Sequence, residues 1–345
     1  LYLARLILHI GNINMTDKER LAERIKELTG WQVNLARMRI ITDTSDWMRI
    51  TRGDVIRIGS CNCEFVVRGN MREPRFGIDD QPKYWVFHAI DLKTAEEKII
   101  KTVFYEEFIA HIGIFKIRCY RDPIKEAEVL DLIHGDRRFM QGESYLDEAG
   151  NNVRVMDFIR GKSLFHTIPA IDKSHEQYFN EDLPVLLWNI LDSIEAVRHL
   201  HKHGFCHGDV RNDHIIIDAE SGKFRWIDFD LKQDVADFDM WSIGNILSYA
   251  VGKGIITFKQ ASKSGKFSNE VINSFTNDDG SAFYNYRVMN HKKLFPYVPD
   301  KLADILLHFT INPISYYHTF EEFYIDYYEM LEKEFSSGKG KNILQ

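Results

Sequence analysis

The sequence has no apolar run long enough to cross a membrane. A membrane-spanning helix needs roughly 20 consecutive, mostly apolar residues. The run LYLARLILHI at residues 1–10 is shorter than that and carries Arg5. We therefore expect no membrane span.

Cysteine is scarce, with four residues in 345, namely Cys61, Cys63, Cys119 and Cys206. Only the first two are close together, and no second pair completes the four-ligand set of a structural zinc site. We expect all four to be free thiols in a reducing compartment, and we predict a cytoplasmic protein.

An excess of basic charge is also missing. The formal net charge is -7 and the pI is about 6.1, whereas a general nucleic-acid binder needs a basic surface that neutralises phosphates. We therefore expect no nucleic-acid partner, although a local basic patch stays open. A content of 44% hydrophobic and 28% charged residues is ordinary for a globular protein, and 345 residues suffice for two lobes with cores of their own.

The chain is organised around the stretch HGDVRNDHIIIDAESGKFRWIDFD at residues 207–230. Two apolar runs flank the turn-forming residues 219–222, which predicts a β-hairpin. Folding about that turn sets His214 almost opposite Asp228, while Asp209 lies in the loop that leads into the first strand. Aspartates at the end of a buried ribbon cost desolvation free energy unless a cation or a reacting proton lies between them. A polar loop beside a surface hairpin is the alternative.

The spacing of these residues resembles the catalytic loop and the metal-binding loop of the protein-kinase superfamily, whose patterns are H-R-D-x-x-x-x-N and D-F-G. Here the first loop is HGD at 207–209 followed by His214, and the second is DFD at 228–230. HGD is more similar to the aminoglycoside and small-molecule kinases of that superfamily. The motif DMWSIG, which starts at Asp239, resembles the family's D-x-W-S-x-G helix, whose Asp braces the catalytic loop. The resemblance covers roughly residues 76–332.

The resemblance implies an α+β, two-lobed protein kinase-like fold with a small β-rich N-lobe and a helical C-lobe. The expected domains are an N-terminal helix plus β extension at 1–75, the N-lobe at 76–156, the C-lobe at 157–335 and a flexible tail at 336–345. In the extension, Thr16 and Glu19 form a capping box that starts a helix, and Gly30 ends it.

A nucleotide site is implied by two strand-like runs, YWVFHAIDL and EKIIKTVF. Lys101 on the second run resembles the V-A-I-K lysine that reaches the nucleotide phosphates. Its expected partner is Glu126, on the inward face of a helix that starts at Asp122 and Pro123, and Glu128 is the second choice. The other residues expected at the nucleotide are Val86, Met156, Asp157, Ile159 and Ile216.

The resemblance also implies roles for the two acidic loops, because phosphoryl transfer consists mostly of positioning and charge neutralisation. Asp209 would accept the proton of the attacking hydroxyl group as catalytic base, and Arg211 would face the γ-phosphate. Asp228 would bind the metal, with His214 in place of the family's asparagine and Asp230 as a further oxygen ligand. The implied cofactors are ATP and Mg²⁺, or Mn²⁺, which imidazole binds better. A neutral, hydrogen-bonding His214 is the alternative.

Four features depart from the family pattern. The glycine positions of the loop that covers the nucleotide fall on Asp79, Gln81 and Tyr84, and Ile99 replaces a small alanine. Only ten residues separate Asp228 from Asp239, which is too short for an activation segment with a protein-substrate platform. Tyr316 replaces the arginine of the family's D-P-x-x-R segment.

Three hypotheses follow from these residues. The leading one is an ATP-dependent phosphotransferase that transfers the γ-phosphate to a hydroxyl group of an unidentified protein or small-molecule acceptor. The second is a pseudokinase that binds a nucleotide, or none, and acts as a signalling scaffold. The third is a metal-dependent phosphoesterase that uses His207, Asp209, His214 and Asp228. Metal-dependent stabilisation by ATP distinguishes the first hypothesis from the second, and phosphate release from a monoester without ATP would support the third.

Overall fold

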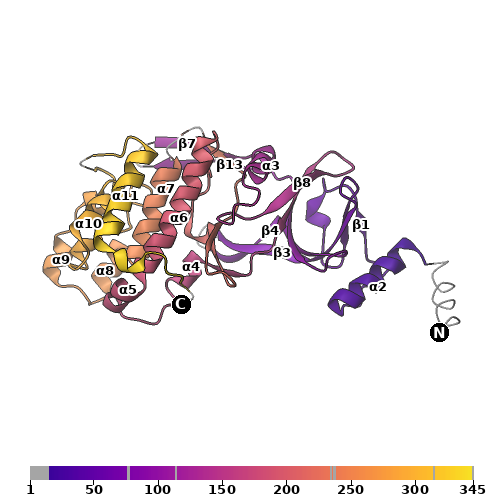
Figure 1. The fold of residues 1–345 in the computed structure, drawn as a ribbon, viewed down its shortest axis with the longest axis horizontal. Coiled ribbons are helices and arrows are strands. Elements are labelled where there is room, and N and C mark those ends of the chain that lie inside the picture. The colour runs from indigo at the N-terminus through magenta and orange to yellow at the C-terminus, as the bar shows by residue number, and fades with distance from the viewer. Residues whose placement is uncertain are drawn as a thin grey trace. The chain divides into compact units, whose positions relative to one another are not determined.

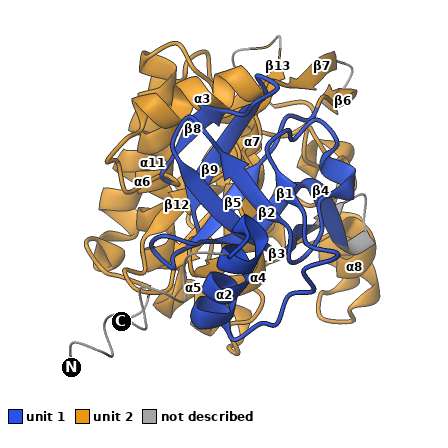
Figure 2. Cartoon of the chain, turned by 90° about the vertical axis from the view of Figure 1, so that its right-hand side faces the viewer, with its two compact units in different colours: residues 1–104, 141–158 blue, residues 105–140, 159–345 orange. Residues whose placement is uncertain are grey.

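The computed structural model describes residues 15–75, 78–112, 115–233, 235, 238–313 and 315–343. Helices and strands both contribute to the chain, so the protein is of the mixed α+β class, and Figure 1 labels the elements. The chain divides into two compact units, coloured in Figure 2. Unit 1 comprises residues 1–104 and 141–158, and unit 2 comprises residues 105–140 and 159–345.

Unit 1 is built on one seven-stranded sheet with the strand order β1-β2-β3-β4-β5-β9-β8. Neighbouring strands are antiparallel, apart from the parallel pair β1 and β2. The strands are β1 (Ile40–Ile41), β2 (Val55–Ile58), β3 (Cys63–Arg75), β4 (Ile78–Asp91), β5 (Glu97–Lys101), β8 (Gly142–Leu146) and β9 (Asn152–Asp157). A short 3-10 turn, η1 (Trp47–Arg49), lies between β1 and β2. The two predicted strands that flank residues 93–96 are confirmed as β4 and β5.

Apolar side chains cover both faces of this sheet. Because successive residues of a strand point to opposite faces, Phe65 and Val66 belong to different clusters. One cluster joins Phe65 to Phe87 and Ile100, and the other joins Val66 to Ile90 and to the helix α2 (Asp17–Thr29). The sheet therefore has a buried core on each side.

The helix α2 begins and ends where the sequence predicts. Thr16 and Glu19 make the reciprocal capping box, and Gly30 ends the helix at φ 72°. Its buried residues Leu21 and Ile25 lie in the same cluster as Val66 of β3. Residues 15–75 and the strands that follow them therefore share one sheet and one core, so the expected boundary at residue 75 does not separate two units.

Unit 2 is mainly helical. Its helices are α3 (Pro123–Leu132), α4 (Leu164–Thr167), α5 (His175–Glu181), α6 (Leu183–Lys202), α7 (Phe238–Val251), α8 (Phe258–Lys263), α9 (Asn269–Asn273), α10 (Asp300–Leu307) and α11 (Phe320–Glu334). Short 3-10 turns are η2 (Asn212–His214), η3 (Asn277–Asp279), η4 (His291–Lys293) and η5 (Ser336–Gly338). The helix α6 buries an apolar side against α5, α7 and α11, and Figure 1 shows α6, α7 and α11 next to one another. This packing positions the loop that follows α6.

Two small sheets complete unit 2. The first has the order β10-β11-β12, with β10 (Gly161–Ser163), β11 (Ile215–Asp218) and β12 (Phe224–Trp226). The second has the order β13-β7-β6, with β6 (Glu107–Ile112), β7 (Phe115–Arg121) and β13 (Leu231–Gln233). The antiparallel register Ile215↔Trp226 confirms the predicted hairpin. The sheet of β6, β7 and β13 has no counterpart in the sequence analysis, and it joins residues 105–140 to unit 2 instead of to the expected N-lobe at 76–156.

The cysteines differ from expectation. Cys61 and Cys63 form a disulfide across the turn between β2 and β3, so the prediction of four free thiols is wrong for this pair. The turn, in which Asn62 has φ 54°, brings the two side chains together. Cys119 and Cys206 are free.

The chain after α11 also differs from the expected flexible tail. Trp188 Nε1 donates a hydrogen bond to the carbonyl of Phe335 at 2.8 Å, and Asn189 Nδ2 donates to the carbonyl of Lys341 at 3.4 Å. Gly338 lies so close to the backbone of Pro184 that a Cβ would collide with it. Residues 336–343 are therefore packed against α6.

Across the part of the chain that the structure describes, every helix is too short or too polar to span a bilayer. The run at residues 1–10, which the sequence analysis considered, lies outside the described residues.

Candidate functional site

Three side chains of unit 2 converge at the end of the β11–β12 hairpin. Asp209, His214 and Asp228 each offer one ligand atom, and these atoms all lie within 4.8 Å of one another. His214 ends the turn η2 and leads into β11, and Asp228 comes after Ile227 at the end of β12. The backbone N–H of Ile227 donates to the carbonyl of His214 at 3.0 Å. The hairpin register therefore places His214 opposite Ile227, so that Asp228, the next residue, lies almost opposite His214, as predicted.

The imidazole of His214 has one defined tautomer when it is neutral. Its Nδ1 lies 2.9 Å from the backbone carbonyl oxygen of Asp209, which can only accept, so we assign the hydrogen to Nδ1. The other nitrogen, Nε2, is then an acceptor that lies 3.7 Å from Asp228 Oδ2. Nε2 is buried and has no hydrogen-bond partner among the described residues.

A metal ion fits this arrangement. The lone pair of Nε2 and the carboxylate of Asp228 repel each other unless a cation or a proton lies between them. Histidine ligands of metals commonly donate their other ring N–H to a backbone carbonyl, as His214 does to Asp209. Two carboxylates and one imidazole make a donor set suited to Mn²⁺, and to Mg²⁺ less well. Asp209, His214 and Asp228 are therefore the residues that could hold a divalent cation.

The backbone of Asp228 is strained. It has φ 70°, in the left-handed region, which costs a residue with a side chain roughly 1–2 kcal/mol. The next residue, Phe229, is fully buried, and its N–H donates to Glu126 Oε1 at 3.3 Å. Such strain concentrates at functional sites, where the surrounding structure imposes it. Glu126 of α3, expected at the nucleotide, therefore contacts the DFD segment.

Asp230 lies against an arginine that the sequence analysis did not single out. Arg121, at the end of β7, places Nη1 2.6 Å from Asp230 Oδ1 and 3.8 Å from Asp228 Oδ1, and its Nε donates to Glu106 Oε2 at 2.9 Å. Burial by itself lowers the pKa of Arg121, but the charges of Asp230 and Asp228 outweigh it and raise the pKa above its ordinary value. Asp230, expected as a metal ligand, is thus bound to Arg121 and lies outside the group of three.

Asp239 braces the HGD loop, as predicted. It is fully buried, and its carboxylate accepts hydrogen bonds from the backbone N–H of His207 at 2.6 Å and of Gly208 at 2.8 Å. His201 Nε2 lies 2.9 Å away on the other side. Burial alone raises the pKa of Asp239, but the His201 contact and the nearby His207 outweigh it, and the pKa lies below its ordinary value. The carboxylate therefore stays charged and holds the loop backbone.

Gly208 and Lys125 fix the loop from the other side. Gly208 has φ 91°, and a Cβ there would collide with the carbonyl oxygen of Leu231 in β13. The buried Lys125 of α3 donates to the carbonyls of His207 at 3.0 Å and of Leu231 at 2.6 Å. Sequence reasoning missed Lys125 because its partners lie on segments more than 80 residues away.

Arg211 and Ile216 have defined positions in unit 2. The guanidinium of Arg211 donates through Nε to Asp213 Oδ1 at 3.0 Å, and its Nη1 lies 3.9 Å from Asp209 Oδ2. Ile216 is half-buried in β11, where it pairs with Arg225 and with Ser163. Arg211 therefore places a positive charge near the carboxylate of Asp209.

Unit 1 places four of the expected nucleotide-site positions on one face of its sheet. The register pairs Val86 with Lys101, and Ile99 with Met156. Paired residues and residues two apart share a face, so these four side chains lie on the same side. Lys101 is only 3% exposed. Its cross-strand partner Arg154, which the sequence analysis missed, is 1% exposed and donates to the carbonyl of Thr102 at 3.0 Å.

The other positions expected at the nucleotide stay predictions. Asp157 is exposed and its carboxylate accepts from Lys98 Nζ at 2.8 Å. The three expected glycine positions lie inside the strand β4 instead of in a loop. Lys101 belongs to unit 1, whereas Ile159 and Glu126 belong to unit 2, so the expected Lys101–Glu126 pair stays a prediction.

Comparison with known proteins adds no assignment to this geometry. Neither the protein-family models nor the curated proteins include a match to this chain.

Proposed function

We propose that this chain is an ATP-dependent phosphotransferase with a protein kinase-like fold, in which Asp209 is the catalytic base and Asp228 binds the metal. One observation carries the proposal. The ligand atoms of Asp209, His214 and Asp228 lie within 4.8 Å of one another, on two loops whose order along the chain resembles the catalytic and metal-binding loops of protein kinases. Asp239, which accepts hydrogen bonds from the backbone of the first loop, supports the same proposal.

The proposed reaction transfers the γ-phosphate to a hydroxyl group. The hydroxyl oxygen forms a bond to the γ-phosphorus, its proton passes to Asp209, and the bond between the γ-phosphorus and the β–γ bridging oxygen breaks to release ADP. Asp228 and His214 would hold the divalent cation, which would neutralise charge on the phosphate oxygens. Arg211, whose Nη1 lies 3.9 Å from Asp209 Oδ2, contributes further positive charge to those oxygens.

The proposed lobes are assigned from the elements. The seven-stranded sheet of unit 1, with Lys101 on its β5 strand, corresponds to the small lobe, and the helices of unit 2 correspond to the large lobe. The helix α3 carries Glu126, and α7 carries the bracing Asp239. With this assignment, the mixed α+β protein has the two-lobed kinase-like fold that we propose.

The test is to measure γ-phosphate loss from ATP with Mg²⁺ and with Mn²⁺ for the wild type and for Asp209→Asn. We expect the variant to lose about 10²-fold or more of the rate, which is the lower end of what general-base catalysis contributes, and we expect the wild type to prefer Mn²⁺ because of His214. Asp192→Asn is the matched control, since Asp192 lies on α6 with a side chain 52% exposed. Equal rates in the wild type and Asp209→Asn would remove the proposal.

A nucleotide-free scaffold is the second candidate. It is favoured by the strand that continues through the expected glycine positions and by Arg121, whose guanidinium already lies 3.8 Å from Asp228. Thermal unfolding of the wild type with ATP and each metal distinguishes the two candidates. A metal-dependent rise in the melting temperature supports the phosphotransferase, whereas no shift with any nucleotide supports the scaffold.

A further inference from the structure

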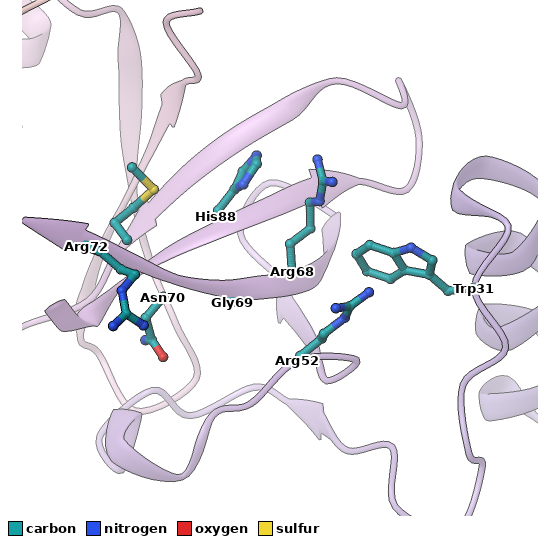
Figure 3. Close-up of a pocket in the computed structure, with 8 residues that line it drawn as sticks. Trp31, Arg52, Arg68, Gly69, Asn70, Arg72 and His88 are labelled. Atoms are coloured by element: carbon teal, nitrogen blue, oxygen red, sulfur yellow. The ribbon is translucent and has the colours of Figure 1, made fainter. Parts of the chain in front are cut away.

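A cavity of about 270 Å³ opens in unit 1, and none of the residues that line it has a role in the proposed reaction (Figure 3). Its lining includes three arginines, Arg52, Arg68 and Arg72, together with Trp31 and His88. Among the residues that the structure describes, none of those that line it is acidic. The cavity therefore concentrates positive charge in a chain whose formal net charge is -7.

An irregularity in the sheet presents Arg68. The pairing of β3 with β4 moves from Val67↔Ala89 to Gly69↔His88, so Arg68 is the extra residue of a β-bulge. Bulges redirect a side chain and are frequent beside binding sites. Gly69 has φ 156° and open space where a Cβ would be, so it permits this bulge and leaves the strand backbone uncovered at the cavity.

Trp31 holds two of the guanidinium groups in place. The guanidinium carbon of Arg52 lies 4.4 Å from the centre of the indole ring, and that of Arg68 lies 5.6 Å from it. Figure 3 shows the Arg52 group directed toward the ring and the Arg68 group beside it, while Arg72 lies on the other side of Gly69. The indole is itself anchored, because Trp31 packs against the core beneath α2. Cation–π contacts thus order two cations before a ligand arrives.

Positive charge remains after the internal ion pairs are counted. Glu97 accepts from Arg68 and lies 3.2 Å from His88 Nε2. Burial, and then the charge of Arg68, lower the pKa of His88, so His88 adds no cation at neutral pH. Arg52 is exposed and has no carboxylate partner among the described residues. Arg52 therefore brings to this cavity a positive charge that none of the described carboxylates neutralises.

We propose that this cavity is a binding site for a phosphate monoester. Guanidinium groups bind phosphate oxygens through pairs of parallel hydrogen bonds, and two or more arginines match the double negative charge of a monoester. A volume of 270 Å³ equals that of roughly nine water molecules in the liquid, which suits one phosphate and the group that carries it. The indole faces Arg52 and Arg68, so it orders those arginines and is not the platform for a base. The carrier is a free metabolite or a phosphorylated side chain of a polypeptide.

The test is isothermal titration calorimetry on the full chain with three probes. These are glucose 6-phosphate, a phosphoserine tripeptide with its unphosphorylated form, and a single-stranded DNA 12-mer. We expect at least one monoester to bind, with an affinity that falls as salt rises. Arg52→Ala should weaken that binding about tenfold or more, and Arg52→Lys should weaken it less, because lysine keeps the charge but loses the paired hydrogen bonds.

The matched controls separate this site from the proposed catalytic site. Arg49→Ala, at an arginine 78% exposed and paired with Asp46, should leave the affinity unchanged, and so should Asp228→Asn. Melting temperatures confirm that each variant is folded, and Trp31→Phe provides a second variant with weakened binding if Arg52→Ala unfolds. Preference for one monoester identifies the carrier. Failure of both monoesters to bind, equal binding by the wild type and Arg52→Ala, or tighter Arg52-dependent binding of the DNA would each overturn the proposal.

Discussion

Gly208 is the middle residue of the HGD loop, and its backbone geometry explains why a glycine is present there. The residue adopts φ 91°, and the carbonyl of Leu231 occupies the space that a side chain would need. Lys125 donates to that same carbonyl, and Asp239 accepts from the Gly208 N–H. The loop is thus held by buried polar contacts that leave no room for a side chain at this position.

Replacing Gly208 by alanine should destabilise the protein. The left-handed backbone alone costs about 1–2 kcal/mol for a residue with a Cβ, and the collision with the Leu231 carbonyl adds to this cost. We expect the free energy of unfolding, measured by urea denaturation, to fall by at least about 2 kcal/mol. Gly59→Ala is the control, because a Cβ at Gly59 meets open space. Similar stabilities for the two variants would contradict this account of the HGD loop.

The ends of the helix α2 and its position in unit 1 are set by different interactions. Its ends are set by local signals, the capping box at Thr16 and the left-handed Gly30. Its position is set by Leu21 and Ile25, which lie in one cluster with Val66 of β3. The first part of the described chain is therefore a component of the seven-stranded unit.

Leu21→Ala should destabilise the whole of unit 1. Leu21 is fully buried, and truncating a buried leucine to alanine costs about 2–5 kcal/mol. Hydrogen exchange of the β3 and β4 amides should accelerate in the variant, because these strands share the core with α2. Leu35→Ala serves as the control, since Leu35 is 40% exposed. If exchange accelerated only in α2, the helix would be a separately folding attachment.

Elements formed by neighbours in sequence could be predicted, and elements formed by distant segments could not. The β11–β12 hairpin and the start of α3 at Asp122 are local, and both are confirmed. The strand β13 pairs with β7 more than 100 residues earlier, a contact that no local pattern signals. The same sheet places Arg121 beside Asp230, and therefore changes the contacts of an expected metal ligand.

At the scale of the molecule, buried histidines make stability depend on pH. Burial lowers the pKa of His175 to about 4, of His207 to about 3 and of His291 to about 3. In the unfolded chain a histidine has a pKa of about 6.5. Between that pH and the lower folded pKa values, the unfolded state therefore binds more protons than the folded state. Stability is therefore fully present above the unfolded pKa and is lost as the pH falls, by about 1.4 kcal/mol per pH unit for each of the fully buried His207 and His291 and by less for the half-buried His175.

The measurement is the free energy of unfolding in urea from pH 7 to pH 4.5. We expect a decline over this range in the wild type and a shallower decline in His291→Gln, because one buried imidazole is gone. His203→Gln should keep the wild-type slope, since His203 is exposed. Identical slopes in the wild type and His291→Gln would show that His291 does not contribute to this loss.

Local sequence signals predicted the hairpin that brings His214 almost opposite Asp228, and they predicted the caps of α2. These features depend on turn residues, capping residues and strand spacing, which act over short distances along the chain. Contacts between distant segments account for the pairing of Asp230 with Arg121, for the support that Lys125 gives the HGD loop, and for the three arginines around one cavity. These depend on which distant strands and helices lie together, and that choice is made by the packing of the whole core.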